Sequence, residues 1–318
     1  MADSIPSVGA LAVSGDTLVC GTDRGVLGFG LVTGTPRQVP GAERAGLQDV
    51  RAVATGTLAD RPVAMALQRY GESRCHAWYL DDGAPIRSDW MPPGAEAIAI
   101  ARARDRTLAI VGTPDGDLIV ADLATGDQVR EPYSFRDRIR YVGLVTVSGV
   151  PVLVASCHGK VFTRYLYDSD RQRFPLWDEN VTPPIREDKA LPNTDTGWAT
   201  AVGDLDSIPF VACGNEDGKI ALYTLGRERL AASPLTGSFD KISALAFCRL
   251  GGRPVLASGA FDGTLRAWDM TNTASAVTIS TRAAVGGIAL VEPDLCMVGT
   301  TKGVLAVRLS FPESQPER

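Results

Sequence analysis

Histidine and long apolar runs are scarce in this sequence. Its 318 residues include only two histidines and no Cys-x-x-C pair, which leaves few ligands for a zinc ion. No segment approaches the roughly 18 consecutive apolar residues that span a membrane, and residues 1–7 carry neither the basic cluster nor the apolar run of a secretion signal. We therefore expect no metal, no cofactor, no membrane association and a cytoplasmic location.

Lysine is also rare, and the overall charge is acidic. Arginine outnumbers lysine 27 to 5, and alanine and glycine are abundant, a composition typical of GC-rich bacterial genomes. The net charge of −5 gives no sign of the basic face that nucleic-acid binding favours. Two of the six cysteines, Cys20 and Cys213, stand five residues before a recurring glycine, where other copies carry valine or serine. We interpret them as small, reduced core residues.

A five-residue pattern, Gly-x-x-x-Gly, recurs along the whole chain. It reads GTDRG at 21–25, GTPDG at 112–116, GNEDG at 214–218, GAFDG at 259–263 and GTTKG at 299–303, and weaker copies end at Gly71 and Gly159. The final glycines are 40 to 59 residues apart. Repeats of this length are typical of propellers and other arrays, so the fold has to be read as repeated units.

Each turn glycine lies between two short apolar runs, such as 210–213 and 219–223 around Gly218. Such runs predict a tight hairpin, because glycine supplies the positive φ of the turn. A small–apolar–small triplet precedes every hairpin, for example Ala10-Leu11-Ala12, and predicts a third strand in a crowded place near an axis. Residues 173–177, 229–235 and 276–281 are candidates for a fourth strand. Four strands in about 40–45 residues indicate a propeller blade.

Residues 242–269 resemble a WD-repeat blade, with the turn pair Asp262-Gly263 and the closing pair Trp268-Asp269. The resemblance covers nearly the whole chain in seven copies. It implies an all-β fold, a seven-bladed β-propeller of four-stranded antiparallel blades, as a single domain over residues 1–318. The chain departs from the family where a Gly-His pair is replaced by Gly237-Ser238, and only one copy ends in Trp-Asp. We therefore expect packing, more than a buried hydrogen-bond network, to hold most blades.

The repeat breaks once, between Gly159 and Gly218, where the spacing is 59 residues. This interval contains an insertion loop at about 178–197 that has three prolines and no periodicity, and long loops are often functional. A polar tail occupies about 310–318. We predict that residues 4–7 supply the outer strand of the seventh blade and so close the ring.

Function in a propeller depends on its two faces and its central mouth. We predict a non-catalytic scaffold or sensing module, a monomer on its own, that binds a protein or peptide on the face of the glycine turns, because arginine and aromatic residues are favoured anchors. The candidate residues are Arg24, Arg69, Tyr70, Trp90, Arg136, Arg138, His158, Trp177, Trp198, Phe261 and Lys302.

The alternative is a propeller enzyme or small-molecule binder that uses the central mouth, roofed by residues 178–197. In that case Arg69, Tyr70, His158 and Trp198 are the residues to test. The adjacent Cys157-His158 pair could activate a thiolate, but neighbours in sequence rarely face each other productively. With so few catalytic residues, we predict no catalytic site and favour the interaction module.

Overall fold

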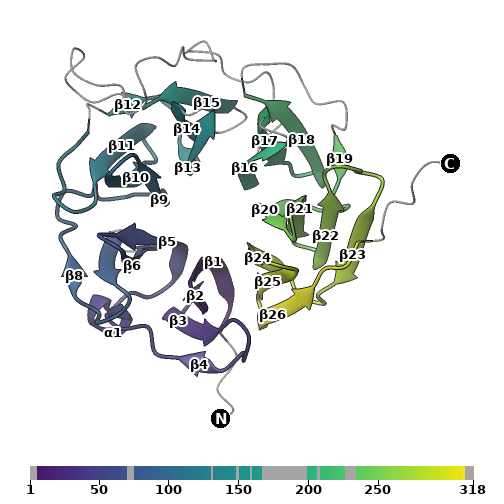
Figure 1. Ribbon diagram of the computed structural model, residues 1–318, viewed down its shortest axis with the longest axis horizontal. Coiled ribbons are helices and arrows are strands. Elements are labelled where there is room, and N and C mark those ends of the chain that lie inside the picture. Colours follow the sequence, from purple (N-terminus) through teal and green to yellow (C-terminus); the bar gives the residue numbers. More distant parts are fainter. Residues whose placement is uncertain are drawn as a thin grey trace.

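The strands of the protein form seven separate antiparallel sheets arranged in a ring, as the computed structural model shows (Figure 1). The structure describes residues 6–69, 75–129, 132–147, 150–157, 160–166, 199–205, 208–225 and 234–311. Each sheet is one blade, and its strands follow one another in sequence from the centre outward. The predicted seven-bladed β-propeller is confirmed.

Blades 1 to 3 are each four-stranded in the described part of the chain. Blade 1 consists of β1 (Val8–Ser14), β2 (Thr17–Thr22), β3 (Gly25–Gly30) and β4 (Pro36–Arg37). Blade 2 consists of β5 (Val50–Leu58), β6 (Arg61–Gln68), β7 (Cys75–Tyr79) and β8 (Pro85–Ile86). Blade 3 consists of β9 (Ala97–Ala103), β10 (Arg106–Gly112), β11 (Asp117–Asp122) and β12 (Tyr133–Ser134).

Blades 4 to 7 continue the ring. Blade 4 consists of β13 (Ile139–Val147), β14 (Val150–Cys157) and β15 (Lys160–Tyr165). Blade 5 consists of β16 (Ala199–Leu205), β17 (Ile208–Gly214), β18 (Lys219–Thr224) and β19 (Leu235–Thr236). Blade 6 consists of β20 (Ile242–Leu250), β21 (Arg253–Ala260), β22 (Thr264–Asp269) and β23 (Ala276–Ser280). Blade 7 consists of β24 (Val285–Val291), β25 (Leu295–Thr300) and β26 (Gly303–Arg308).

The outer strands are much shorter than the inner ones, and four of them have only two residues. The prediction of a fourth strand at 276–281 is confirmed by β23. The candidate at 229–235 overlaps β19 only at Leu235, because residues 229–233 lie outside the described part. The candidate at 173–177 and the insertion loop at 178–197 also lie outside it.

The glycine turns have the predicted backbone. Gly25, Gly116, Gly218, Gly263 and Gly303 all have φ between 75° and 122°, a region that side chains disfavour. In blades 1 and 7 a threonine closes the turn: its hydroxyl donates to the carbonyl of the final glycine at 2.9 Å and accepts the N–H of the residue before that glycine at 3.1 Å. Gly71 and Gly159 lie outside the described residues.

The core lies between neighbouring blades. Fully buried side chains of blade 2, such as Met65, pack with Val111 and Leu123 of blade 3, and the same pattern repeats around the ring. The predicted small residues of the inner strands are needed for this packing. A Cβ built on Gly203 would lie 2.2 Å from the ring of Phe247 in the next blade. Each inner strand can therefore approach its neighbour closely around the channel.

The ring closes by direct packing of blade 7 on blade 1. A Cβ on Gly286 would lie 2.6 Å from the carbonyl oxygen of Val8, so β24 and β1 meet backbone to backbone. The prediction that residues 4–7 form the outer strand of blade 7 is wrong at Ser7. Its carbonyl accepts the N–H of Asp23 at 3.2 Å, which ties it to the first turn of blade 1 instead. Residues 4 and 5 lie outside the described part.

Helical structure is nearly absent from the described residues. The short helix α1 (Ala42–Ala45) connects blades 1 and 2. No helix in the described ranges has both the length and the apolar character that crossing a membrane requires. The structure is therefore almost entirely β, as the repeat analysis predicted.

Candidate functional site

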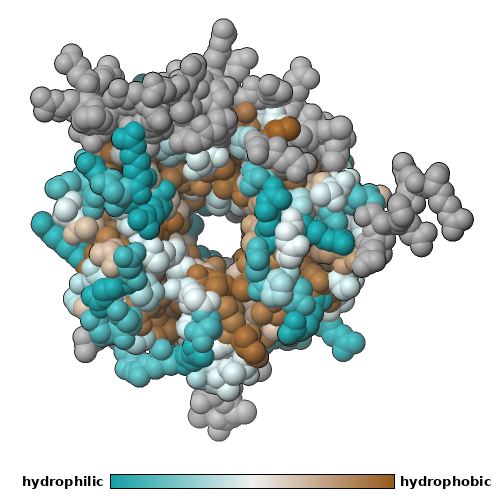
Figure 2. All heavy atoms as spheres, in the orientation of Figure 1, coloured by the Kyte–Doolittle hydropathy of each residue, from teal (hydrophilic) through white to brown (hydrophobic). Residues whose placement is uncertain are grey.

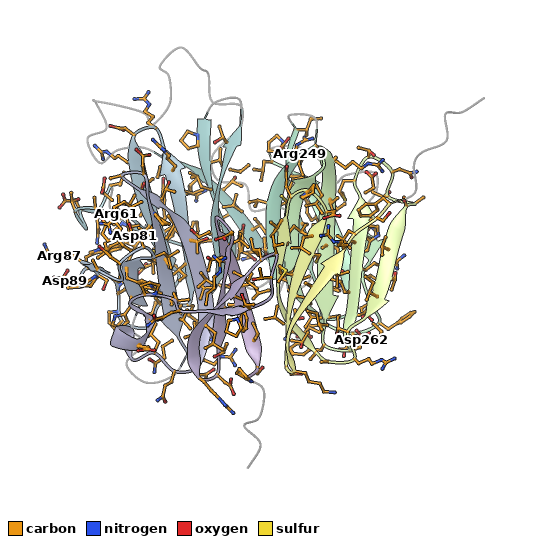
Figure 3. All side chains as sticks on the ribbon, turned by 60° about the horizontal axis from the view of Figure 1, so that its bottom comes forward. Arg61, Asp81, Arg87, Asp89, Arg249 and Asp262 are labelled. Carbon is orange, nitrogen blue, oxygen red and sulfur yellow. The ribbon has the colours of Figure 1, made fainter. Side chains whose placement is uncertain are left out.

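The two faces of the ring carry different connections. Turns between second and third strands, which contain the recurring glycines, lie on one face together with the segments that enter each inner strand; we call this the glycine-turn face. Turns between first and second strands lie on the opposite face. Figure 3 shows this separation in blade 6, where Asp262 and Arg249 lie at opposite ends of the blade.

Six of the predicted partner-binding residues lie on the glycine-turn face. They occupy either the glycine turns or the segments that lead into inner strands, and they are Arg24, Arg69, Arg136, Arg138, Phe261 and Lys302. Tyr70, His158, Trp177 and Trp198 lie outside the described residues. Lys302 contacts the neighbouring entry segment, since its ammonium donates to the carbonyl of Arg282 at 3.3 Å.

Trp90 lies elsewhere than predicted. A Cβ built on Gly126 would lie 2.5 Å from Cδ1 of Trp90, and Gly126 belongs to the connection between β11 and β12, at the opposite end of blade 3 from its glycine turn. The indole also joins the apolar cluster between blades 2 and 3. The segment after β8 passes along blade 3 before it reaches the glycine-turn face. Trp90 therefore packs between blades 2 and 3.

Two phenylalanines form the most exposed aromatic feature of the glycine-turn face. Phe239, just before β20, is 98% exposed, and Phe261, in the turn of the same blade, is 50% exposed. The backbone N–H of Phe261 donates to the carbonyl of Lys241 at 3.1 Å, and the Lys241 ammonium lies 5.5 Å from the centre of the Phe261 ring. We call Phe239, Lys241 and Phe261 the phenylalanine patch.

Sequence reasoning missed Phe239. The sequence feature that could have identified it is its position in a turn, between Ser238 and Asp240. No alternating strand pattern surrounds it that would direct a large apolar side chain into the core. The Asp240 N–H donates to the Ser238 hydroxyl at 3.0 Å, which holds this turn in place. The exposed ring is therefore carried by an ordered loop.

A second cluster lies where three consecutive blades begin. The Glu96 carboxylate lies between two guanidiniums, 3.4 Å from Arg51 Nη1 and 3.5 Å from Arg138 Nε. Arg51 stands near the start of β5, Glu96 just before β9 and Arg138 just before β13, so the three side chains bridge blades 2, 3 and 4. We call them the arginine–glutamate bridge. Only Arg138 was predicted, because the pairing depends on which blades are neighbours.

Lys241 and Arg140 add positive charge to the same face. Burial lowers the pKa of the Lys241 ammonium, Glu216 raises it, Arg140 lowers it and Asp240 raises it. Arg140 stands at the start of β13 in blade 4, and Lys241 lies just before β20 in blade 6. With Arg51 and Arg138, cationic side chains therefore occur at the entrances of blades 2, 4 and 6.

Blade 6 has a hydrogen-bond network in its glycine turn. The Ser238 hydroxyl donates to the Asp262 carboxylate, which also accepts the N–H of Thr264 at 2.8 Å. Partial burial raises the pKa of the Asp262 carboxyl, but these hydrogen bonds outweigh it and hold the pKa below its ordinary value. A serine hydroxyl thus supplies the side-chain donor of this network.

The central channel is lined by both apolar and polar groups. Figure 2 shows an open hollow at the centre of the ring with hydrophobic side chains along its wall. A cavity of about 290 Å³ in this channel is lined by Val13, Tyr141, Thr200, Ala201, Val202, Leu245, Ala246, Phe247, Ala289 and Leu290. Polar and apolar atoms contribute comparable parts of its lining, so it can accommodate a small molecule that carries both kinds of group.

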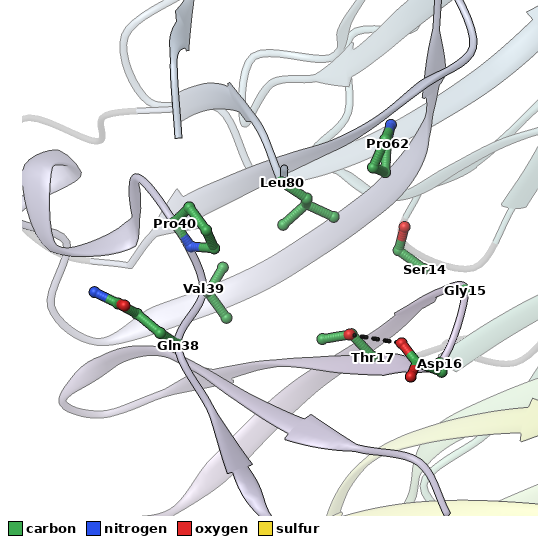
Figure 4. Close-up of a pocket in the computed structure, with 9 residues that line it drawn as sticks. All are labelled: Ser14, Gly15, Asp16, Thr17, Gln38, Val39, Pro40, Pro62 and Leu80. Atoms are coloured by element: carbon green, nitrogen blue, oxygen red, sulfur yellow. Dashed lines mark hydrogen bonds between the residues drawn. The ribbon is translucent and has the colours of Figure 1, made fainter. Parts of the chain in front are cut away.

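Another cavity of about 290 Å³ lies between blades 1 and 2 near the opposite face (Figure 4). Val39, Pro40 and Leu80 form its apolar side, and Asp16 and Thr17 face them. The Asp16 carboxylate is already paired with Arg37, with 2.7 Å between Oδ1 and Nη1. This shallow groove therefore offers little unsatisfied charge for a ligand.

In the described ranges, no three His, Cys, Asp or Glu side chains gather closely enough to hold a metal ion. Burial raises the pKa of Cys20, Cys75 and Cys213 to about 12. Cys20 and Cys213 are buried in β2 and β17, as the interpretation of core cysteines predicted.

Comparison with known proteins identifies the fold alone. No protein-family model matches the chain, and no curated protein sequence matches it. Among solved structures, the chain is similar to the computationally designed Ika8 protein, with 16% identity, a TM-score of 0.61 and coverage of 97% of this chain and 98% of that one. It is also similar to BBS1N, in a crystal structure with ARL6DN, with 11% identity, a TM-score of 0.68 and coverage of 99% of this chain and 95% of that one. Both likenesses are to propeller structures, in agreement with the seven sheets of this chain.

Proposed function

We propose that this protein is a non-catalytic interaction module that binds a protein partner through its glycine-turn face. The phenylalanine patch is the observation that supports this proposal. Monomeric proteins tolerate scattered exposed apolar residues, but two phenylalanines beside a lysine on ordered turns have the composition of a binding hot spot. The WD-repeat resemblance of residues 242–269 supports the same function, and BBS1N, which shares the fold, is itself described in a complex with ARL6DN.

Site-specific photo-crosslinking tests the face. A photoreactive amino acid at Phe239 is expected to capture a partner in the native host, whereas the same group at Val32 is not. Val32 is a matched control, because it is 91% exposed and apolar but lies between β3 and β4 on the opposite face. Equal capture of the same protein at both positions would contradict the proposal.

The captured partner, once purified, permits a quantitative test. The double variant Phe239→Ala/Phe261→Ala is expected to weaken its binding at least roughly tenfold, since buried aromatic anchors contribute about 1–2 kcal/mol or more each. Val32→Ala is expected to bind as the unchanged protein does. Unchanged affinity of the double variant would show that the patch is not the binding surface.

The channel cavity favours a second candidate function, the binding of a small molecule. Its size is near the lower end of the range for ligand pockets, roughly 300–1,000 Å³. Native mass spectrometry of the purified protein is expected to show a retained ligand if this candidate is right. Val202→Glu should then abolish retention, while Phe239→Ala should leave it unchanged.

A further inference from the structure

The arginine–glutamate bridge has more positive than negative charge. A single carboxylate, that of Glu96, is shared by two guanidiniums, and its side chain is only 11% exposed. The arginines are more open to solvent, with side-chain exposures of 27% for Arg51 and 53% for Arg138. The bridge therefore presents guanidinium groups outward and keeps its carboxylate inward.

The geometry of the bridge leaves binding capacity on both arginines. Strong charge-assisted hydrogen bonds between guanidinium and carboxylate groups measure about 2.7–2.9 Å and are frequently bidentate. The closest contacts of Glu96 are 3.4 Å and 3.5 Å, one to each arginine. Each planar guanidinium has five N–H donors, so one long contact with Glu96 occupies only a small part of its donor capacity.

We propose that Arg51 and Arg138 bind a side-chain carboxylate from an acidic segment of the protein partner, and that Glu96 occupies the place between the two guanidiniums until that segment arrives. This inference rests on the proposed function and specifies the chemistry of the partner. Charge complementarity supports it, because Arg140 and Lys241 extend the cationic surface beyond the bridge.

A protein carboxylate fits these observations better than a nucleic-acid backbone. A polyanion gains affinity from many cations spread over a basic face, whereas this chain has a net charge of −5 and carries an acidic residue inside the bridge itself. Two guanidiniums that already flank one carboxylate match a single planar anion. Glu96 is in effect an internal competitor for that anion.

Peptide binding tests the inference directly. The probe is a short, capped, fluorescent peptide of glutamate and leucine, compared with its glutamine–leucine counterpart by fluorescence anisotropy. Glu96→Gln is expected to tighten binding of the glutamate peptide roughly tenfold, because it removes the competing charge, and Arg138→Gln to weaken it by a similar factor. Neither variant should affect the glutamine peptide.

Arg308→Gln is the matched control, since Arg308 pairs with Asp294 on blade 7 at the opposite face and loses the same charge. Thermal melting checks that every variant folds. Unchanged or weaker binding of the glutamate peptide by Glu96→Gln overturns the inference, as does equal binding of the glutamine peptide. Tighter binding of a single-stranded oligonucleotide than of the glutamate peptide also overturns it. If the peptide fails while the double phenylalanine variant still loses its partner, the proposed function stands and only the acidic chemistry is wrong.

Discussion

The hydroxyl of Ser238 donates a hydrogen bond to the carboxylate of Asp262, and this bond joins the loop entering β20 to the glycine turn of the same blade. Ser238 also accepts the N–H of Asp240 at 3.0 Å, so its hydroxyl connects the entry loop and the turn. We expected packing to hold most blades, and blade 6 has this polar connection in addition.

Removing this donor should destabilise the fold modestly. Ser238→Ala is expected to lower the free energy of unfolding by about 1 kcal/mol, less than the roughly 1.5–3 kcal/mol of a hydrogen bond to a charged group, because Asp262 is exposed and solvent screens it. Urea unfolding followed by circular dichroism measures the change. Ser280→Ala, at an exposed position of β23, is the control and should be neutral.

The same pair predicts a dependence on pH. The folded-state pKa of Asp262 lies below its ordinary value of 3.8, so ionisation of this carboxyl stabilises the fold above that value. The stability is lost as the pH falls through the lowered pKa. The difference between the unchanged protein and Ser238→Ala should therefore be complete at neutral pH and shrink below pH 3.8. A difference that grows in acid would contradict this assignment.

Closure of the ring should depend on the absence of a side chain in β24. Gly286→Ala places a Cβ 2.6 Å from the carbonyl oxygen of Val8, and relieving that overlap should cost about 1–3 kcal/mol. Gly9→Ala is the matched control, because Gly9 lies in the facing strand and a Cβ there meets nothing within 4 Å. Thermal melting should separate the two variants, and equal melting temperatures would show that the blades close in another way.

Thiol reactivity should report burial. Burial raises the pKa of the thiol of Cys75 to about 12, so almost no thiolate is present at pH 8. Cys248 is partly exposed, and its pKa is also raised by burial. Titration of the native protein with a thiol reagent is expected to modify Cys248 first and slowly, and denaturant should expose all six cysteines. Rapid labelling of Cys20 or Cys213 would contradict their core assignment.

The parts of this fold that could be predicted are those in which every blade requires the same backbone conformation or the same small residue. A positive φ at Gly263 and a small residue at Gly203 are local requirements, so they recur in the sequence at a readable interval. The position of Trp90 could not be read in this way, because the path of its loop depends on the turn of the next blade. The pairing of Arg51 with Glu96 likewise requires knowledge of which blades are neighbours.

The way the glycine turns are closed has a consequence for how this protein can diversify. In blades 1 and 7 the threonines at the second turn position make the closing bonds, and the fourth residue contributes only its backbone N–H to them. Arg24 and Lys302 occupy that fourth position. Any residue except proline supplies the same N–H, so selection can exchange these side chains while the closing bonds of the turn are kept, and in blade 7 the exchange removes only the contact of Lys302 with Arg282. The array resembles a display scaffold, in which new binding specificities evolve at little cost to folding.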